Sequence, residues 1–298
     1  MMATAASAAN PEMQQRLSDQ LEAIVGRRIA NDQLVLPALP AAAVKCLTLL
    51  KNPNFSLREA AAIIETDPIL AARLLKLANS AAFGGRDSSK TITNAVTRLG
   101  LQKLRAFLVE ASASKVFESN DRRIAEASRT LWTHSVAVAV VARDVTALCG
   151  GGDPELAYLG GLLHDVGKPV VAAMLLDAER AMLEAKKHAV WINGTDWVAV
   201  VQRIHRKVGV SLVERWEMPQ PVRNAVRDCE EYDNSDRVSV ANVVRFANAV
   251  VKQRGIYIGA VNAEDNDAMV MIGRSLLNMD DEMVERATAG LAKLGGMV

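Results

Sequence analysis

Hydrophobic positions along this chain recur with the period of a helix, and strand-like alternation is nearly absent. Residues 57–65, 69–83 and 122–150 each carry apolar side chains every three or four positions, a spacing that places them on one face of an α-helix. The second half of 122–150 is apolar on nearly every side, which indicates a helix at the centre of a core. The polar segment 85–91 reads as a loop. The pattern predicts an all-α fold.

Local signals mark where these helices start and stop. Ser56 and Glu59 have the spacing of a capping box, in which each side chain bonds the other residue's backbone N–H. Asp67-Pro68 and Asp153-Pro154 each offer an N-cap carboxylate followed by a proline, which is favoured in the first helical turn. We interpret Gly167 as the stop of the helix that Asp153 starts.

Composition supports this interpretation and limits the partners. Half of the 298 residues are hydrophobic and only 4% are aromatic, a balance that favours helices packed through small side chains over a β-sandwich. Lys and Arg together number 35 against 34 Asp and Glu, so no overall field attracts nucleic acid or an anionic membrane. We therefore expect no membrane partner, and nucleic acid only through a local patch.

The cysteines and the N-terminus indicate a cytoplasmic location. Cys46, Cys149 and Cys229 are far apart and odd in number, which suits reduced thiols rather than a disulfide framework. The first residues are rich in alanine but lack the basic start and apolar block of a signal peptide. No uncharged run reaches the roughly 20 residues that a membrane-spanning helix needs.

The candidate chemistry is concentrated in two histidines and their neighbours. His134 and His164 are two of only four histidines, and both fall in very apolar helical stretches, where an imidazole without a partner is costly to bury. A divalent cation could satisfy both together with the Asp165 carboxylate, because these groups are ordinary ligands for zinc, manganese or iron. The alternative is structural: Asp165 could accept a hydrogen bond from His134 or pair with Lys168, and Gly167 would simply end a helix.

Several motifs give the chain a family resemblance. LPALP at 36–40, Asp67-Pro68, LLKLANS at 74–80 and AVTRLGL at 95–101 occur in this order, and AYLGGLLHDVGK follows at 157–168. In these motifs the sequence resembles the HD-related output domain (HDOD) family of the HD phosphohydrolase superfamily, over roughly residues 30 to 255. The resemblance implies an N-terminal helical lobe packed on an HD-like helical lobe, and a bacterial signalling role. We expect four segments: 1–30, an N-terminal extension; 31–118, the N-terminal lobe; 119–255, the HD-like lobe; and 256–298, a helical tail.

The resemblance also implies a metal site, from which this chain departs. Enzymes of the superfamily hold a metal with a histidine, a His-Asp doublet and a later aspartate, and the first three map onto His134, His164 and Asp165. The later aspartate is replaced by Asn248. A neutral amide removes one negative charge from the ligand set, so affinity for a divalent ion should fall.

A second departure concerns the two-metal relatives, which carry extra histidines after the doublet. His205 is retained, but Asp228-Cys229 stands where a His-His pair is expected, so a binuclear cluster is not expected. Lys168 matches a position that could contact a phosphate in relatives. Its alternative role is that of a cation near a helix C-terminus.

Two functional hypotheses follow. The leading one is a non-catalytic signalling module that binds partner proteins, including those of second-messenger pathways, and keeps a degenerate metal site. This hypothesis requires no cofactor, although a weakly bound divalent metal (zinc, manganese, iron or magnesium) is compatible with it. It is also compatible with a homo-oligomer. The other is a mononuclear metal-dependent phosphohydrolase acting on a nucleotide or cyclic dinucleotide, with Lys168 at the phosphate.

A third hypothesis, nucleic-acid binding, rests on a short basic cluster. Arg98, Lys103 and Arg105 surround Gly100 without interleaved aromatic residues. We interpret them as a solvated helix face.

Overall fold

A computed structural model describes residues 39–80, 88–119, 121–184, 194–228, 231–259 and 261–293, together with isolated residues at 19, 23, 24, 27, 31 and 83. Throughout these residues the chain forms α-helices and short 3-10 helices and no strand. The all-α prediction is therefore confirmed.

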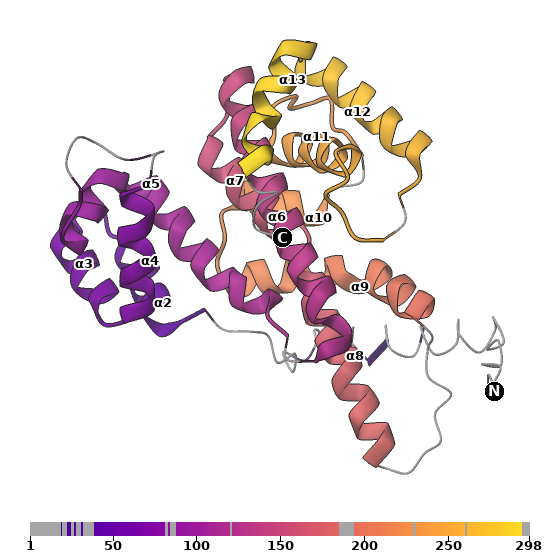
Figure 1. Cartoon of the computed structure of the whole chain (residues 1–298), viewed down its shortest axis with the longest axis horizontal. Helices are drawn as coiled ribbons and strands as arrows, with labels where there is room; N and C mark the ends of the chain where they lie inside the picture. The colour runs from indigo at the N-terminus through magenta and orange to yellow at the C-terminus, as the bar shows by residue number, and fades with distance from the viewer. Residues whose placement is uncertain are drawn as a thin grey trace.

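The helices gather into two lobes (Figure 1). The first lobe contains α2 (Ala41–Leu49), α3 (Leu57–Glu65) and α4 (Pro68–Ala78). Helix α5 (Ile92–Ala113) packs on them and is followed by η1 (Ser114–Phe117). The second lobe contains α6 (Arg122–Cys149), α7 (Pro154–Leu163), α8 (Gly167–Glu184), α9 (Gly194–Arg215), α10 (Gln220–Arg227) and α11 (Val240–Gln253). The tail helices α12 (Ala263–Leu277) and α13 (Asp281–Thr288), with η2 (Ala289–Lys293), pack on α11 and α6.

The predicted helix starts are present in the structure. The Ser56 hydroxyl accepts hydrogen bonds from the backbone of Glu59 and its neighbour, and the Glu59 carboxylate accepts from the Ser56 N–H, which completes the capping box. Asp67 and Asp153 each accept two backbone N–H bonds at the start of α4 and α7. These caps satisfy helix-end donors that would otherwise lack partners.

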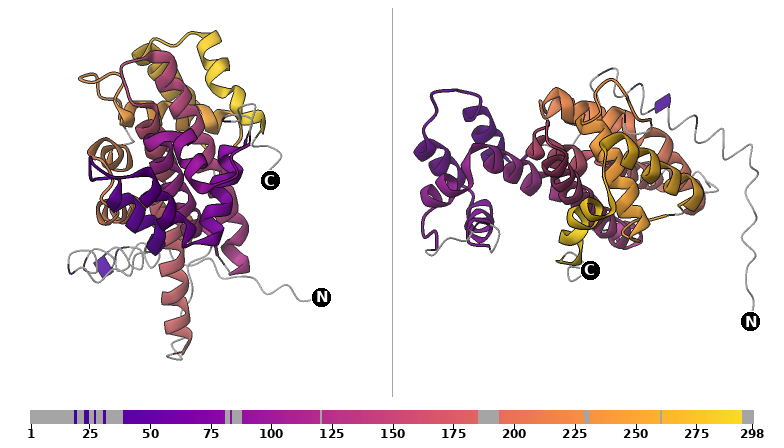
Figure 2. Two further views of the ribbon diagram at one scale, coloured as in Figure 1. Left: turned by 90° about the vertical axis from the view of Figure 1, so that its left-hand side faces the viewer. Right: turned by 90° about the horizontal axis from the view of Figure 1, so that it is seen from above.

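Gly100 redirects α5 between the lobes. Its φ of 73° and ψ of 173° interrupt the helix, a conformation that residues with a side chain rarely adopt. Helix α5 packs with α3 and α4 of the first lobe and also contacts α7 of the second lobe. Seen from above, the first lobe projects to one side of the second (Figure 2).

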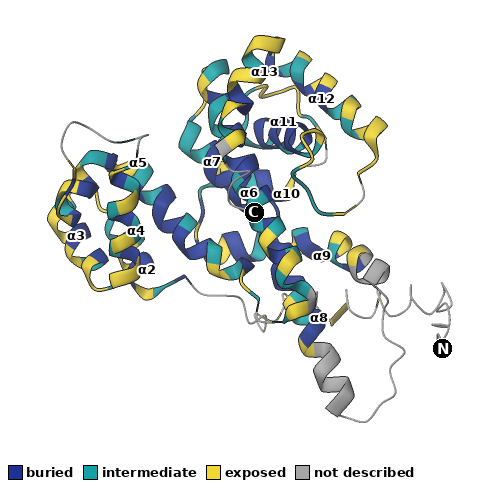
Figure 3. Ribbon diagram, viewed as in Figure 1, coloured by how far each residue is buried: buried dark blue, intermediate teal, exposed yellow. Residues whose placement is uncertain are grey.

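The two lobes have separate hydrophobic cores. Ile64, Leu74 and Leu104 belong to the core of the first lobe. In the second lobe α6 lies between two apolar clusters, since Ala139 packs in one and Val138 in the other. Buried positions therefore surround the second half of α6, as its apolar sequence predicted (Figure 3).

The interpretation of Gly167 as a helix stop is wrong. Helix α7 ends at Leu163, a three-residue turn follows, and Gly167 begins α8. A Cβ atom at this position would overlap the backbone carbonyl of His205 and come within 2.8 Å of the Gly209 nitrogen. Glycine is required here because α8 and α9 approach each other closely, a tertiary reason that the local sequence does not carry.

One stretch, Pro154–Asp177, is long and apolar enough by composition to cross a membrane. Within it, 83% of the most apolar window is buried inside the protein. The stretch therefore forms part of the core of the second lobe, as α7 and the start of α8.

Candidate metal centre

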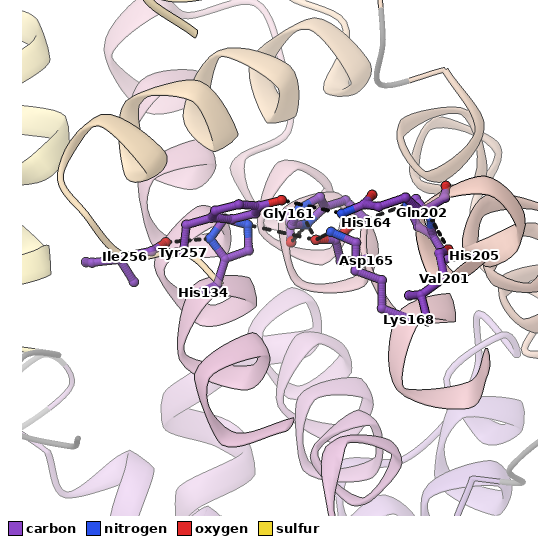
Figure 4. A network of polar contacts seen from close by, with 10 residues as sticks. All are labelled: His134, Gly161, His164, Asp165, Lys168, Val201, Gln202, His205, Ile256 and Tyr257. Atoms are coloured by element: carbon purple, nitrogen blue, oxygen red, sulfur yellow. Dashed lines mark hydrogen bonds and ion pairs between the residues drawn. The ribbon is translucent and has the colours of Figure 1, made fainter. Parts of the chain in front are cut away.

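His134, His164 and Asp165 meet in the interior of the second lobe. His134 comes from the middle of α6, and the other two come from the end of α7 and the turn after it. The Nε2 atoms of His134 and His164 lie 3.9 and 3.3 Å from Oδ2 of Asp165, and the two ring centroids are 5.3 Å apart. The structure thus brings together the three residues that the sequence singled out (Figure 4).

Backbone carbonyls fix the orientation of both rings. Nδ1 of His134 donates to the carbonyl of Ile256 at 2.7 Å, and Nδ1 of His164 donates to that of Gly161 at 2.7 Å. A carbonyl can only accept, so each Nδ1 carries a proton. Since burial lowers the pKa of His134 to about 3, the Nε2 atom of His134 keeps its lone pair at neutral pH. Both Nε2 atoms are buried and have no hydrogen-bond partner among the described residues. Histidines that bind metal typically donate their other ring N–H to a backbone carbonyl in this way.

His205 joins the cluster from α9. Its Nδ1 lies 2.8 Å from the carbonyl oxygen of Gln202 and 3.0 Å from that of Val201, and its Nε2 lies 3.6 Å from Oδ1 of Asp165. In the sequence His205 was recognised as a retained histidine, but it was not assigned to the group of His134, His164 and Asp165. The structure puts three imidazoles around one carboxylate.

Lys168 also faces Asp165. Its Nζ lies 2.6 Å from Oδ2 in a buried ion pair, and the residue belongs to the first turn of α8. The suggestion that Lys168 is a cation near a helix C-terminus is therefore wrong, because a new helix begins at Gly167. The alternative pairing with Asp165 is the one observed.

Burial sets the charge state of this cluster. His134 is fully buried, and Asp165 and Lys168 are only 5% and 7% exposed. Burial lowers the pKa of His134 to about 3 and that of His205 to about 4, so both imidazoles are neutral at neutral pH. Burial opposes ionisation of Asp165, but nearby His164 and Lys168 outweigh it and hold its pKa well below the usual range.

The residues present fit a divalent cation. The three ligand atoms of His134, His164 and Asp165 all lie within 4.8 Å of one another. Ligands bonded at about 2.1 Å to a tetrahedral ion are about 3.4 Å apart, close to the two separations from Asp165 given above. Two imidazole nitrogens and one carboxylate form an ordinary donor set for zinc, manganese or iron.

The two departures from the superfamily pattern lie in α11 and after α10. Oδ1 of Asn248 is buried and has no hydrogen-bond partner within the described part of the chain, so it offers an acceptor but no charge. Asp228 caps the end of α10 and pairs with Arg227 at 2.8 Å at the surface. Cys229 lies outside the described residues. The Asp228 carboxylate therefore pairs with Arg227 and not with the cluster.

Sequence reasoning missed Tyr257. Its ring meets that of His134 edge-on with centroids 5.4 Å apart, and Nζ of Lys168 lies 5.7 Å from its centroid. No local signal in the sequence connects Tyr257 with His134, because the two residues lie far apart along the chain.

The basic cluster in α5 is not a solvated face. Arg98, Lys103 and Arg105 are all half-buried. Arg98 donates to the carbonyl of Ala78 at 3.1 Å, and Lys103 pairs with Glu155 of α7 at 2.7 Å. These cations help to hold the protein together, so they present less free charge than the sequence suggested.

A two-lobed helical protein with a histidine, a His-Asp doublet and a following lysine in its second lobe has the architecture of an HD-type domain. The chain matches the HDOD domain family over residues 36–232. It belongs to that family, and the resemblance noted in the sequence is confirmed.

One curated relative matches in sequence, and solved structures share the fold. A Treponema pallidum (strain Nichols) protein of uncharacterised function is 28% identical over 249 residues; the match covers 80% of this chain but 45% of that protein. This chain thus spans about half the length of its curated relative. A Shewanella amazonensis SB2B protein, provisionally described as a metal-dependent phosphohydrolase, superposes with a TM-score of 0.69 at 23% identity, covering 92% of this chain and 99% of the other. A Marinobacter aquaeolei VT8 protein, provisionally described as a signal transduction protein, gives 0.64 at 21% identity, with coverage of 94% and 65%.

Proposed function

We propose that this chain is a bacterial, cytoplasmic regulatory module that acts through contacts with partner signalling proteins and does not turn over a substrate. Its buried cluster serves as a polar centre of the second lobe with weak affinity for one divalent cation. The observation that carries the proposal is the ion pair between Lys168 and Asp165. The ammonium group already neutralises the single carboxylate that the cluster contains.

Charge balance limits how tightly a cation can bind. Asp165 and Lys168 cancel, and neutral His134 and His205 add no charge. A divalent ion would bring two positive charges into a buried site. Among the described residues, Asp165 is the one carboxylate in the group of possible ligands, and Asn248 is neutral. Uncompensated buried charge is strongly unfavourable, so cation binding requires Lys168 to move away or lose its proton.

Burial argues against catalysis in this conformation. Four side chains of the cluster are each at most 8% exposed: His134, His164, Asp165 and Lys168. A hydrolase must bring a phosphate and a water molecule to the metal at the same time. That would require a rearrangement of the second lobe.

A regulatory role is supported by features outside the cluster. The curated relative is about twice as long as this chain, as expected for a module that recurs within longer proteins. Large apolar side chains are exposed on both lobes, including Ile69 of α4 at 69% and Met271 of α12 at 68%. Such side chains are available to partner proteins.

The second candidate function is a mononuclear metal-dependent phosphohydrolase acting on a nucleotide or cyclic dinucleotide. It is favoured by the buried Nε2 atoms of His134 and His164, which have no hydrogen-bond partner in the described part of the chain. The description of the Shewanella neighbour also favours it. In this case a divalent ion held by these histidines and Asp165 would supply Lewis acidity and an acidified water. Lys168 would leave Asp165 and steady the phosphate.

Replacement of Lys168 distinguishes the two functions. If the ammonium competes with the ion, Lys168→Met should raise the affinity for Mn²⁺ by about tenfold or more, with no hydrolysis of bis(4-nitrophenyl) phosphate by either protein. If Lys168 steadies the phosphate, the wild type should hydrolyse this diester and Lys168→Met should lower the turnover without raising affinity. Affinity is measured by competition with a chelator, and His164→Ala is the control that removes a ligand.

A further inference from the structure

The segment Gly255–Gly259, here called the strap, crosses the cluster on its way from α11 to α12. Gly255 and Gly259 bound it with φ values of 78° and 105°, conformations that favour glycine. Between them Ile256 packs against one core cluster of the second lobe, and Ile258 packs against the other. The strap lies beyond the family match, which ends at residue 232.

The strap touches the candidate metal centre through its backbone. The carbonyl of Ile256 accepts the Nδ1–H of His134 at 2.7 Å. This bond keeps the proton on Nδ1, holds the ring in place and leaves Nε2 as the ligating atom. A cation bound at Nε2 makes the Nδ1–H a stronger donor, so the bond to the strap strengthens when metal binds.

Tyr257 covers the same histidine with its side chain. Its ring stands at 73° to the His134 ring with centroids 5.4 Å apart, and Lys168 and Lys252 place Nζ 5.7 and 4.8 Å from the Tyr257 centroid. The side-chain amide of Gln202 reaches the hydroxyl at 3.5 Å. Tyr257 is half-buried while His134 is fully buried, and the tyrosine ring lies against the histidine ring (Figure 4).

We propose that the strap is a latch whose closure is coupled to metal occupancy, with Ile256 and Tyr257 as positioning residues for His134. This inference rests on the capacity of the cluster to bind a cation, proposed above. A closed strap holds His134 in its ligating form and slows escape of the ion. By thermodynamic reciprocity, a bound ion must stabilise the closed strap by the same factor. Because α12 begins at Ala263, soon after the strap, we expect metal occupancy to affect the helix that presents Met271 at the surface.

The first measurement is hydrogen exchange of the strap amides in the full chain, with and without saturating Mn²⁺. In the structure the Ile256 N–H donates to the Val251 carbonyl at 3.2 Å, so its exchange reports strap opening. Saturation with Mn²⁺ should slow exchange at Ile256 and Tyr257 about tenfold or more. Unchanged exchange at full occupancy would overturn the coupling.

The second measurement uses a matched pair of substitutions at one position. Tyr257→Ala removes the cover, and we expect Mn²⁺ affinity to fall about tenfold, through faster release into excess chelator. Tyr257→Phe keeps the ring and loses only the contact with Gln202, so its affinity should stay within about twofold of wild type. Val261→Ala, a truncation of a side chain 39% exposed just after the strap, serves as the control. A Tyr257→Ala protein with wild-type affinity and release rate would contradict the latch.

The outcomes separate this inference from the function it rests on. If the wild-type protein takes up no metal, both the metal centre and the latch are wrong. If Mn²⁺ binds to the wild type and not to His164→Ala, yet Tyr257→Ala keeps the wild-type affinity and release rate, the metal centre stands and the latch is wrong. Melting of every variant in chelator distinguishes loss of binding from loss of the fold.

Discussion

The ammonium group of Lys168 lies 2.6 Å from Oδ2 of Asp165, and Nε2 of His164 approaches the same oxygen to 3.3 Å. A lysine and an imidazole nitrogen thus share the carboxylate oxygen that a metal ion would use. An ammonium donates hydrogen bonds but accepts none, so Lys168 is a donor to this oxygen. The protein therefore holds an internal cation where its superfamily relatives are expected to hold a metal.

The contact of Gly167 with α9 gives a stability prediction. In Gly167→Ala the new methyl group would overlap the backbone carbonyl of His205, and backbone cannot move aside as a flexible side chain can. We expect the free energy of unfolding to fall by about 3 kcal/mol. Urea unfolding of the two proteins measures the difference.

Gly209 on the facing helix is the matched control. A methyl group there would lie 3.1 Å from a side-chain carbon of Val226 and 3.5 Å from the Gly167 nitrogen, so small adjustments can relieve the contact. Alanine also favours a helix interior over glycine by about 1 kcal/mol. Gly209→Ala should therefore cost much less than Gly167→Ala, and equal losses would show that the close approach of α8 to α9 is not what requires Gly167.

These residues show what could be predicted from the sequence. The capping of α3 by Ser56 and of α4 by Asp67 depends on residues within one helical turn, so local patterns sufficed. Gly167 was misinterpreted because its reason is a contact with His205, which lies far along the chain. Tyr257 was missed for the same reason, because its contact with His134 joins two distant parts of the chain.

The same distinction between local signals and contacts of distant residues applies to the candidate site. Burial of His134 and His164 in apolar helices could be anticipated, because an imidazole there needs a partner. The sequence could not show which partner each nitrogen has. The protonation of Nδ1 follows from carbonyls at Gly161 and Ile256, and only the folded chain brings Ile256 to His134.

The buried histidines make stability depend on pH. The pKa of His134 falls to about 3 and that of His205 to about 4, from an ordinary value of 6.5. Below pH 6.5 the unfolded chain takes up protons at both positions and the folded chain does not. Their contribution is therefore complete above pH 6.5 and is lost as the pH falls toward 4. Each should cost about 2 kcal/mol between pH 6.5 and pH 5.

A variant that cannot titrate tests this assignment. His205→Gln removes one of the two groups, so the dependence of unfolding free energy on pH over this window should become shallower by about 1.4 kcal/mol per pH unit. Urea unfolding in chelator at several pH values measures both slopes, without a contribution from metal. Identical slopes in the two proteins would mean that His205 is not held neutral by burial.

The turn after α9 combines backbone strain with a contact between lobes. Glu217 has φ of 51°, and the bonds from its N–H to Glu214 and from the Met218 N–H to Val213 form a Schellman motif, where glycine is usual. Its exposed carboxylate pairs with Lys51, which follows α2 of the first lobe. Exposed pairs contribute little to stability, so the lobes should be held together mainly by their buried contacts.

Two substitutions at this position separate the strain from the ion pair. Glu217→Ala loses the pair with Lys51 and keeps the left-handed backbone, while Glu217→Gly loses the pair and relieves the strain. We expect the glycine variant to melt at the higher temperature of the two, and Lys51→Met to melt close to wild type at any salt concentration. If instead the glycine variant melts lowest and Lys51→Met loses as much, the ion pair between the lobes stabilises the protein more than the backbone strain destabilises it.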